Sequence, residues 1–147
     1  MDSERGHAPH HIGVWLARLV VGAVFLMNVG CALSFLARPD RHAAAFEVGG
    51  VPGLALVRGL GVLFLMWNAT YPLVILQPDR SRAIFAVILV QQVIGLAGEI
   101  WIWLGLPAGH AALRATGLRF ILFDGVGFLG MVGAFWLLEV RRKARRI

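Results

Sequence analysis

The sequence predicts an all-α membrane protein, a four-transmembrane-helix up-down bundle with both termini in the cytoplasm. Hydrophobic residues make up 59% of the 147 positions, against about 45–50% in a typical soluble domain. The apolar residues fall in four blocks, at 12–36, 54–76, 83–106 and 118–140. Each block reaches the roughly 20 residues that a helix needs to cross a bilayer core. We therefore expect one transmembrane domain over residues 12–140.

The first half of the chain is predicted to contain an N-terminal segment, a transmembrane helix and a loop. Residues 1–11 are polar and are expected to form a flexible cytoplasmic N-terminus. The block at 12–36 is too long for the apolar part of a cleaved signal peptide, so we expect it to be retained. Proline and charge at Arg38-Pro39-Asp40-Arg41 should end this helix. The following loop predicts a short interfacial helix over 42–46 and a glycine-rich turn over 49–53.

The second half predicts three further spans joined by short loops. The second span should close near Tyr71-Pro72, and the polar turn at 77–82 should make spans two and three antiparallel neighbours. A small loop after Leu106-Pro107 leads into the last span. That span is followed by a basic cytoplasmic tail over 141–147.

The basic residues indicate the orientation of the bundle. With both termini inside, the cytoplasmic segments carry eight basic residues, namely Arg5, Arg80, Arg82, Arg141, Arg142, Lys143, Arg145 and Arg146. The outer loops carry three, namely Arg38, Arg41 and Arg114. Because basic residues accumulate in cytoplasmic loops, this count predicts a bacterial inner-membrane protein with both termini inside. The tail could also bind anionic lipid headgroups.

Ionisable side chains inside the predicted spans are the candidate site. A charge within a bilayer is costly and usually has a function or a partner on a neighbouring helix. Helical rise counted from the block ends places Arg58, Glu99, Arg119 and Asp124 in the same half of the bilayer. We predict an ion pair of Arg58 with Glu99, and of Arg119 with Asp124 or Glu99.

Three interpretations of this group stay open. The first is an ion-pair lock that fixes the order of the helices, because buried charges are usually paired. The second is a pocket for a polar ligand or a quinone. The third is acid–base chemistry by Glu99 or Asp124. Gln92, Gly95, Glu99 and Trp103 share one helical face, which could line such a pocket or simply face the bundle.

A faint internal repeat suggests polar contacts between the first two spans. Arg18 and Asn28 lie ten positions apart around a Phe-Leu-Met segment, and Arg58 and Asn68 repeat the pattern. Antiparallel packing would bring Arg18 near Asn68 and Arg58 near Asn28, giving two interhelical hydrogen-bonded pairs. Chance similarity between two apolar helices is the alternative.

Several other functions are excluded or disfavoured. The net charge of +6 comes from the ends of apolar blocks and the tail, which does not indicate nucleic-acid binding. The single cysteine, Cys31, excludes an internal disulfide. The histidines lie outside the spans, so neither an intramembrane haem nor a metal site is predicted; His42 and His110 are expected to be solvated. The Gly125–Gly130 stretch matches a dinucleotide-binding pattern but lies inside an apolar span, and predicts helix packing instead.

The first two spans carry a resemblance to a known family. Ala17-Arg-Leu-Val-Val-Gly22-Ala-Val-Phe25, with Gly30 further along and Arg58-Gly-Leu-Gly61 in the second span, resembles the DoxX-like superfamily of small four-helix membrane proteins. The resemblance implies a four-helix bundle that acts as a membrane subunit or accessory partner of an oxidoreductase, in some members linked to quinones. It implies no catalytic residue in this chain.

We therefore expect an accessory or structural subunit of a larger, redox-linked membrane complex. Nearly all of the chain is predicted to lie in the lipid bilayer, so a protein partner would supply any soluble catalytic domain. Two alternatives remain: a small oxidoreductase or isomerase with a quinone or lipid pocket near Glu99 and Asp124, and a transporter subunit that would need homo-oligomerisation. A quinone is the one cofactor suggested, and catalytic residues stay unknown.

Overall fold

The chain folds into a helical bundle whose four long segments match the predicted spans. The computed structural model describes residues 8–144. Its elements are α1 (Ala8–Ala37), α2 (Asp40–Ala43), the 3-10 helix η1 (Ala44–Phe46), α3 (Gly50–Asn68), α4 (Tyr71–Leu76), α5 (Arg82–Gly105) and α6 (Ala111–Ala144). Among the described residues, four segments are long and apolar enough to cross a membrane: Gly13–Ala37, Gly50–Leu76, Arg82–Gly105 and Ala111–Val140. Residues 1–7 of the predicted N-terminal segment and residues 145–147 of the predicted tail lie outside the described residues.

Local sequence explains most of the helix ends. α1 stops at Ala37 because the residue before Pro39 is disfavoured in a helix. The short helix predicted over 42–46 is present as α2 and η1. Glu47 then adopts a left-handed conformation with φ 54°, which reverses the chain into α3. Pro72 lies in the first turn of α4, so the predicted second span consists of two helices.

The last span begins earlier than predicted. α6 starts at Ala111 rather than at residue 118. Two polar side chains in the first two turns find partners that the sequence does not reveal. Arg114 donates to the backbone oxygen of Leu106, with N–O 2.9 Å, and Thr116 donates to that of Ala45, with O–O 2.8 Å. With these groups satisfied, the helix extends beyond the apolar block.

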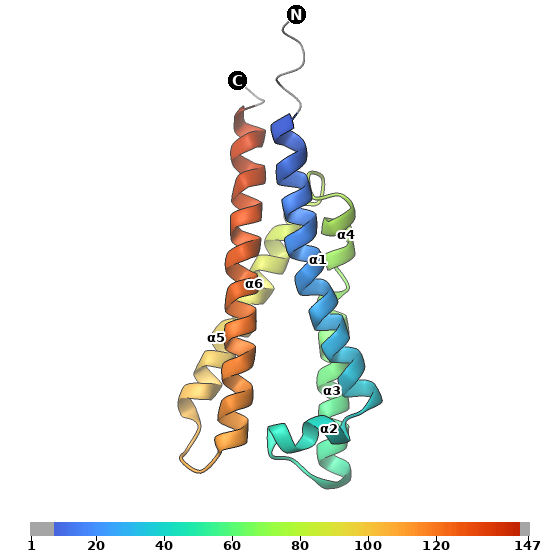
Figure 1. Cartoon of the computed structure of the whole chain (residues 1–147), viewed down its shortest axis with the longest axis vertical. Coiled ribbons are helices and arrows are strands. Elements are labelled where there is room, and N and C mark those ends of the chain that lie inside the picture. Colours follow the sequence, from blue (N-terminus) through green and yellow to red (C-terminus); the bar gives the residue numbers. More distant parts are fainter. Residues whose placement is uncertain (1–7, 145–147) are drawn as a thin grey trace, which may run out of the picture.

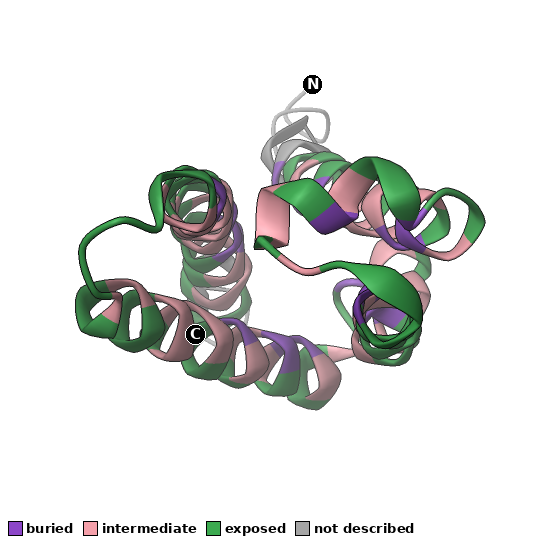
Figure 2. Ribbon diagram, turned by 90° about the horizontal axis from the view of Figure 1, so that it is seen from below, coloured by how far each residue is buried: buried purple, intermediate pink, exposed green. Residues whose placement is uncertain are grey.

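The long helices are arranged as two pairs that are joined on one side. α1 packs against α3 and α6, and α5 packs against α6. Figure 1 shows α1 and α6 close together where the chain begins and ends, and diverging toward the end that carries α2. α5 contacts the second span mainly through α4, so the predicted antiparallel neighbours meet only at that end. Viewed from the α2 end, the helices form a ring (Figure 2).

The apolar core lies in the half of the bundle nearer the start of α1 and the end of α6. Its buried residues are Ala17, Val21, Val24, Tyr71, Val74, Phe85, Ile88, Met131 and Ala134. Two glycines allow α6 to approach α1: a Cβ on Gly127 or Gly130 would lie 3.1 Å from a methyl group of Val24 or Val20. The helix-packing prediction for this stretch is thus confirmed for these two positions.

The register of α1 and α3 differs from the predicted one. A Cβ on Gly61 would lie 2.8 Å from the backbone oxygen of Ala32, so the two helices meet closely at this point. This contact brings Asn28 level with Asn68, and the two amides hydrogen bond at 3.4 Å. The predicted pairs of Arg18 with Asn68 and of Arg58 with Asn28 are therefore not formed.

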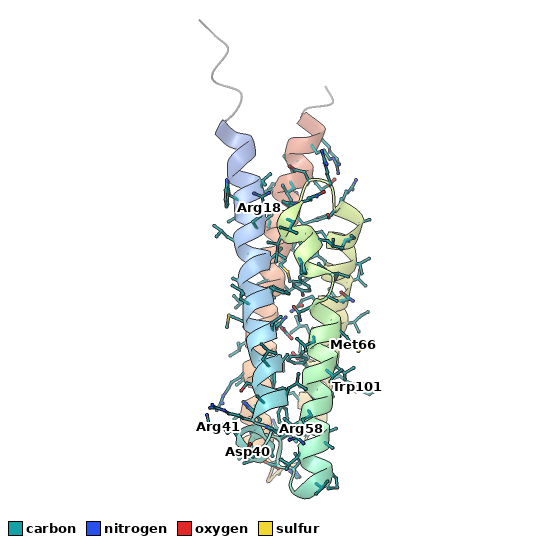
Figure 3. All side chains as sticks on the ribbon, turned by 90° about the vertical axis from the view of Figure 1, so that its right-hand side faces the viewer. Arg18, Asp40, Arg41, Arg58, Met66 and Trp101 are labelled. Carbon is teal, nitrogen blue, oxygen red and sulfur yellow. The ribbon has the colours of Figure 1, made fainter. Side chains whose placement is uncertain are left out.

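Arg18 instead caps α4. Its guanidinium donates to the backbone oxygens of Ile75 and Leu76, at 3.1 and 3.0 Å. Helix C-terminal carbonyls attract cations because they carry a partial negative charge. Figure 3 shows Arg18 in the half of the bundle nearer the chain ends and Arg58 in the half that carries α2.

Large apolar side chains cover the outside of the bundle. Leu26, Met66 and Trp101 are 69%, 66% and 79% exposed, and Figure 3 shows the last two pointing outward. An apolar outer surface over helices of this length is typical of contact with lipid. The four spans and this apolar surface together indicate a multi-pass membrane protein.

Candidate functional site

The half of the bundle that carries α2 encloses a pocket. Its volume is about 570 Å³, and its lining comes from α1, α2, η1, α3, α5 and α6. The pocket exists because α3 and α5 do not pack along their length, while α1–α3 and α5–α6 do. Where the two pairs come together, the Trp67 ring lies so close to Gly95 that a Cβ there would be 2.5 Å from it. The pocket thus ends about halfway along the bundle.

Four phenylalanines from four different elements line the pocket and contact one another in a closed cycle. The centroid distances are 5.6 Å from Phe35 to Phe46, 6.2 Å from Phe46 to Phe120, 6.1 Å from Phe120 to Phe64, and 5.9 Å from Phe64 to Phe35. These separations lie in the range that aromatic pairs prefer. All four line the pocket. The cycle joins α1, η1, α3 and α6 and gives the pocket an aromatic wall.

The inner end of the pocket is polar. Gln92, which is 2% exposed, donates from Nε2 to Oδ1 of Asp124 at 2.9 Å and accepts from the hydroxyl of Tyr71 at 3.3 Å. Asn68, also 2% exposed, donates to the backbone oxygen of Phe64 at 2.8 Å. Gln92 thus links α4, α5 and α6, and the separate Asn28–Asn68 bond links α1 and α3.

Glu99 lies beside Asp124 in the pocket wall. The two carboxyl groups are direct neighbours, one from α5 and one from α6. The two carboxyl groups hydrogen bond to each other. This bond needs a proton on one of them, because an ionised carboxylate can only accept.

The predicted arginine partners do not reach these carboxylates. Arg58 is exposed and forms no ion pair with a described residue. Arg119 lines the pocket, but it is also exposed and forms no such pair. Helical rise predicts how deep a residue lies in the bilayer. It does not determine the direction in which the side chain points, so the predicted pairs could not be established from depth alone.

Two further predicted residues have structural contacts. Trp103 does not line the pocket; its Nε1 donates to the backbone oxygen of Arg114 at 3.1 Å, and its ring lies under that guanidinium. It therefore fastens α5 to α6. Asn28 does line the pocket, together with Asn68. The structure thus brings Gln92, Glu99 and Asp124 together and leaves Arg58 and Trp103 outside.

A polar clasp that sequence reasoning missed holds the α2 end together. Oε1 of Glu47 accepts from the backbone N–H groups of Ala112 and Leu113, both at 3.1 Å, and Oε2 lies 2.5 Å from Nδ1 of His110. The hydrogen bond from His110 is the main cause that lowers the pKa of Glu47, and the bond from Leu113 adds to it. The clasp fastens the loop that follows η1 to the start of α6.

The loop histidines predicted to be solvated are both engaged. Nε2 of His42 lies 2.7 Å from the hydroxyl of Ser34, and its ring packs edge-on against Phe35. His110 belongs to the clasp. No sequence signal could have shown the partner of His110, because Glu47 and His110 are 63 positions apart.

Comparison with protein-family models, with curated proteins and with solved structures gives no match to this chain. The DoxX-like resemblance therefore stays a prediction.

Proposed function

We propose that this protein is a multi-pass protein of the bacterial inner membrane that binds a small, largely apolar molecule in the phenylalanine-lined pocket. One observation carries the proposal: a cavity of about 570 Å³ with an aromatic wall and a polar inner end. Small-molecule sites are typically about 300–1,000 Å³, mostly apolar, with a few polar groups that orient the ligand. The pocket meets each of these criteria.

The orientation predicted from the basic residues would make the pocket accessible from the periplasmic half of the bilayer. The start of α1 and the end of α6 lie together, and α2 lies at the opposite end (Figure 1). With the basic tail in the cytoplasm, α2, η1 and the clasp face the periplasm. A lipid-soluble molecule could then enter from the bilayer or from the interface.

An accessory role in a redox-linked complex remains compatible with such a pocket. In that role the chain would hold the ligand, for example a quinone, and a partner would supply the electron-transfer groups. The oxidoreductase and isomerase alternatives would instead use Glu99 and Asp124 as a proton-transfer pair on the bound molecule.

Filling the pocket tests the proposal. A Cβ on Gly98, which lines the pocket, would meet nothing within 4 Å, so Gly98→Trp should occupy the cavity without displacing a helix. Gly133→Trp is the matched control, because Gly133 is exposed, lies outside the lining and is equally open. In lipid nanodiscs we expect Gly98→Trp to weaken binding of decylubiquinone or a neutral naphthalene probe about tenfold or more, as a loss of about 1.4 kcal/mol would.

The measurement is probe binding by isothermal titration, with thermal unfolding as the folding control. Folded Gly98→Trp that binds every probe as tightly as Gly133→Trp would overturn the pocket as the binding site.

A further inference from the structure

The pocket reaches the outside of the bundle between α1 and α6. These helices touch where Gly127 meets a methyl group of Val24, and they diverge from there toward the α2 end (Figure 1). Met27 on α1 and Arg119 on α6 both line the pocket, and both are exposed, Met27 by 59%. Because the outer surface of the bundle is apolar and faces lipid, this gap is an entrance from the bilayer.

Arg119 is the charged side chain of the lining that the protein leaves without a partner. The carboxyl groups of Glu99 and Asp124 hydrogen bond to each other, and Asp124 also accepts from Gln92. Arg119 forms no hydrogen bond or ion pair with any residue that the structure describes. A guanidinium has five N–H donors, and a charge within a membrane span normally has a partner. The entrance therefore offers an unused cation to a molecule that enters.

The carboxyl pair lies deeper in the pocket than this cation. Asp124 follows Arg119 by five residues on α6, which corresponds to a rise of about 7.5 Å. The lining residues between them on that helix are Phe120 and Phe123. An anionic group at Arg119 is thus set apart from the carboxyl pair, and the aromatic wall lies beside the apolar remainder of the same molecule.

We propose that the pocket binds an anionic amphiphile, a molecule with a carboxylate or phosphate head on an apolar body, with its head on Arg119 at the entrance and its body along the phenylalanines. Arginine binds either head through two parallel hydrogen bonds. This inference rests on the proposed function and names its ligand class. A phospholipid of the bilayer and a free fatty acid or alkyl phosphate share this chemistry.

A matched pair of probes tests the inference on the unaltered protein. Dodecyl phosphate and dodecanol have the same apolar body and differ in the charged head. In nanodiscs of a zwitterionic lipid, with partition into protein-free nanodiscs subtracted, we expect the phosphate to bind about tenfold more tightly than the alcohol. Equal or weaker binding of the phosphate would overturn the inference. Binding of dodecanol in that case would leave the pocket proposal standing.

Variants assign the preference to one guanidinium. Arg119→Gln should bring the ratio of the two affinities close to one while dodecanol binding is retained. Arg58→Gln is the matched control, because Arg58 is an exposed arginine of α3 that lies outside the lining, and it should keep the ratio. An unchanged ratio in folded Arg119→Gln would overturn the assignment. Insensitivity of both probes to Gly98→Trp would instead overturn the pocket itself.

The neutral probe also separates the two sources of the anionic head. Dodecanol carries no charge, so an anionic bilayer does not repel it. If a phospholipid of the bilayer occupies the site, replacing part of the zwitterionic lipid with phosphatidylglycerol should displace dodecanol from the parent chain but not from Arg119→Gln. Undiminished dodecanol binding, together with the preference for dodecyl phosphate, would assign the site to a free anionic amphiphile.

Discussion

Two adjacent glutamines provide a sharp test of the polar network at the inner end of the pocket. Gln92 is 2% exposed and connects Tyr71 to Asp124 through its amide. Gln91 has a buried Oε1 with no hydrogen-bond partner among the described residues. Methionine matches glutamine in length and adapts to irregular sites. Gln92→Met should therefore destabilise the bundle, whereas Gln91→Met should not.

The size of the effect follows from the two shorter of the three hydrogen bonds of Gln92, because the third, to the backbone oxygen of Asp124, is 3.5 Å long. Hydrogen bonds between membrane helices average about 0.6 kcal/mol and reach about 1.7 kcal/mol. The bond to Asp124 is short, at 2.9 Å, and its acceptor is a carboxyl group, so the upper value applies. The bond from Tyr71 is long, at 3.3 Å, so the average applies. Gln92→Met should cost about 2 kcal/mol in total, and Gln91→Met should change stability by less than about 0.5 kcal/mol or increase it.

Reversible unfolding in mixed micelles of increasing dodecyl sulfate content would measure both variants against the parent chain. Tryptophan fluorescence can report the transition, because neither substitution removes a tryptophan. Equal loss of stability in the two variants, or a larger loss for Gln91→Met, would refute the reasoning that this end of the pocket is a satisfied network.

Three further substitutions test the packing and the two polar contacts at the helix ends. Gly61→Ala would place a Cβ 2.8 Å from an α1 backbone oxygen and should cost about 1–3 kcal/mol in unfolding, whereas Gly59→Ala, with open space, should be neutral or stabilising. Arg18→Leu loses two bonds to the end of α4 and should cost about 1 kcal/mol; Arg58→Leu should cost nothing by the same assay. Because its pKa is lowered, Glu47 stabilises the fold above its ordinary pKa and loses this effect as the pH falls through the lowered value. Glu47→Gln should thus have the lower melting temperature at neutral pH, and a gap that does not narrow as the pH is lowered below the ordinary pKa of a glutamate would contradict this.

The spans could be predicted from the sequence because hydropathy and length act locally. Each apolar block is long enough to cross a bilayer, whatever the rest of the chain does. The start of α6 was missed because Arg114 and Thr116 look like loop residues until their partners on other segments are known. Helix ends that depend on distant partners are not encoded in local composition.

The candidate site was predicted in part. Helical rise grouped Glu99 and Asp124 at similar depth, and the shared helical face added Gln92; the structure places all three in the pocket. The same estimate assigned Arg58 to Glu99, yet Arg58 is exposed. Rise along a helix gives depth, whereas a pairing also needs the rotation of each helix and the order of the helices around the bundle. Neither quantity can be obtained from one sequence.

A gradient of side-chain size along one face of α6 explains why the pocket lies where it does. Phe120, Phe123, Gly127, Gly130 and Ala134 follow the alternating spacing of three and four residues that keeps side chains on one face. Gly127 and Gly130 let α1 approach closely, and Ala134 is buried in the core. Phe120 and Phe123 line the pocket, where their bulk keeps α6 away from α1. The same face thus closes the bundle at one end and opens it at the other, so that the pocket is a consequence of helix packing.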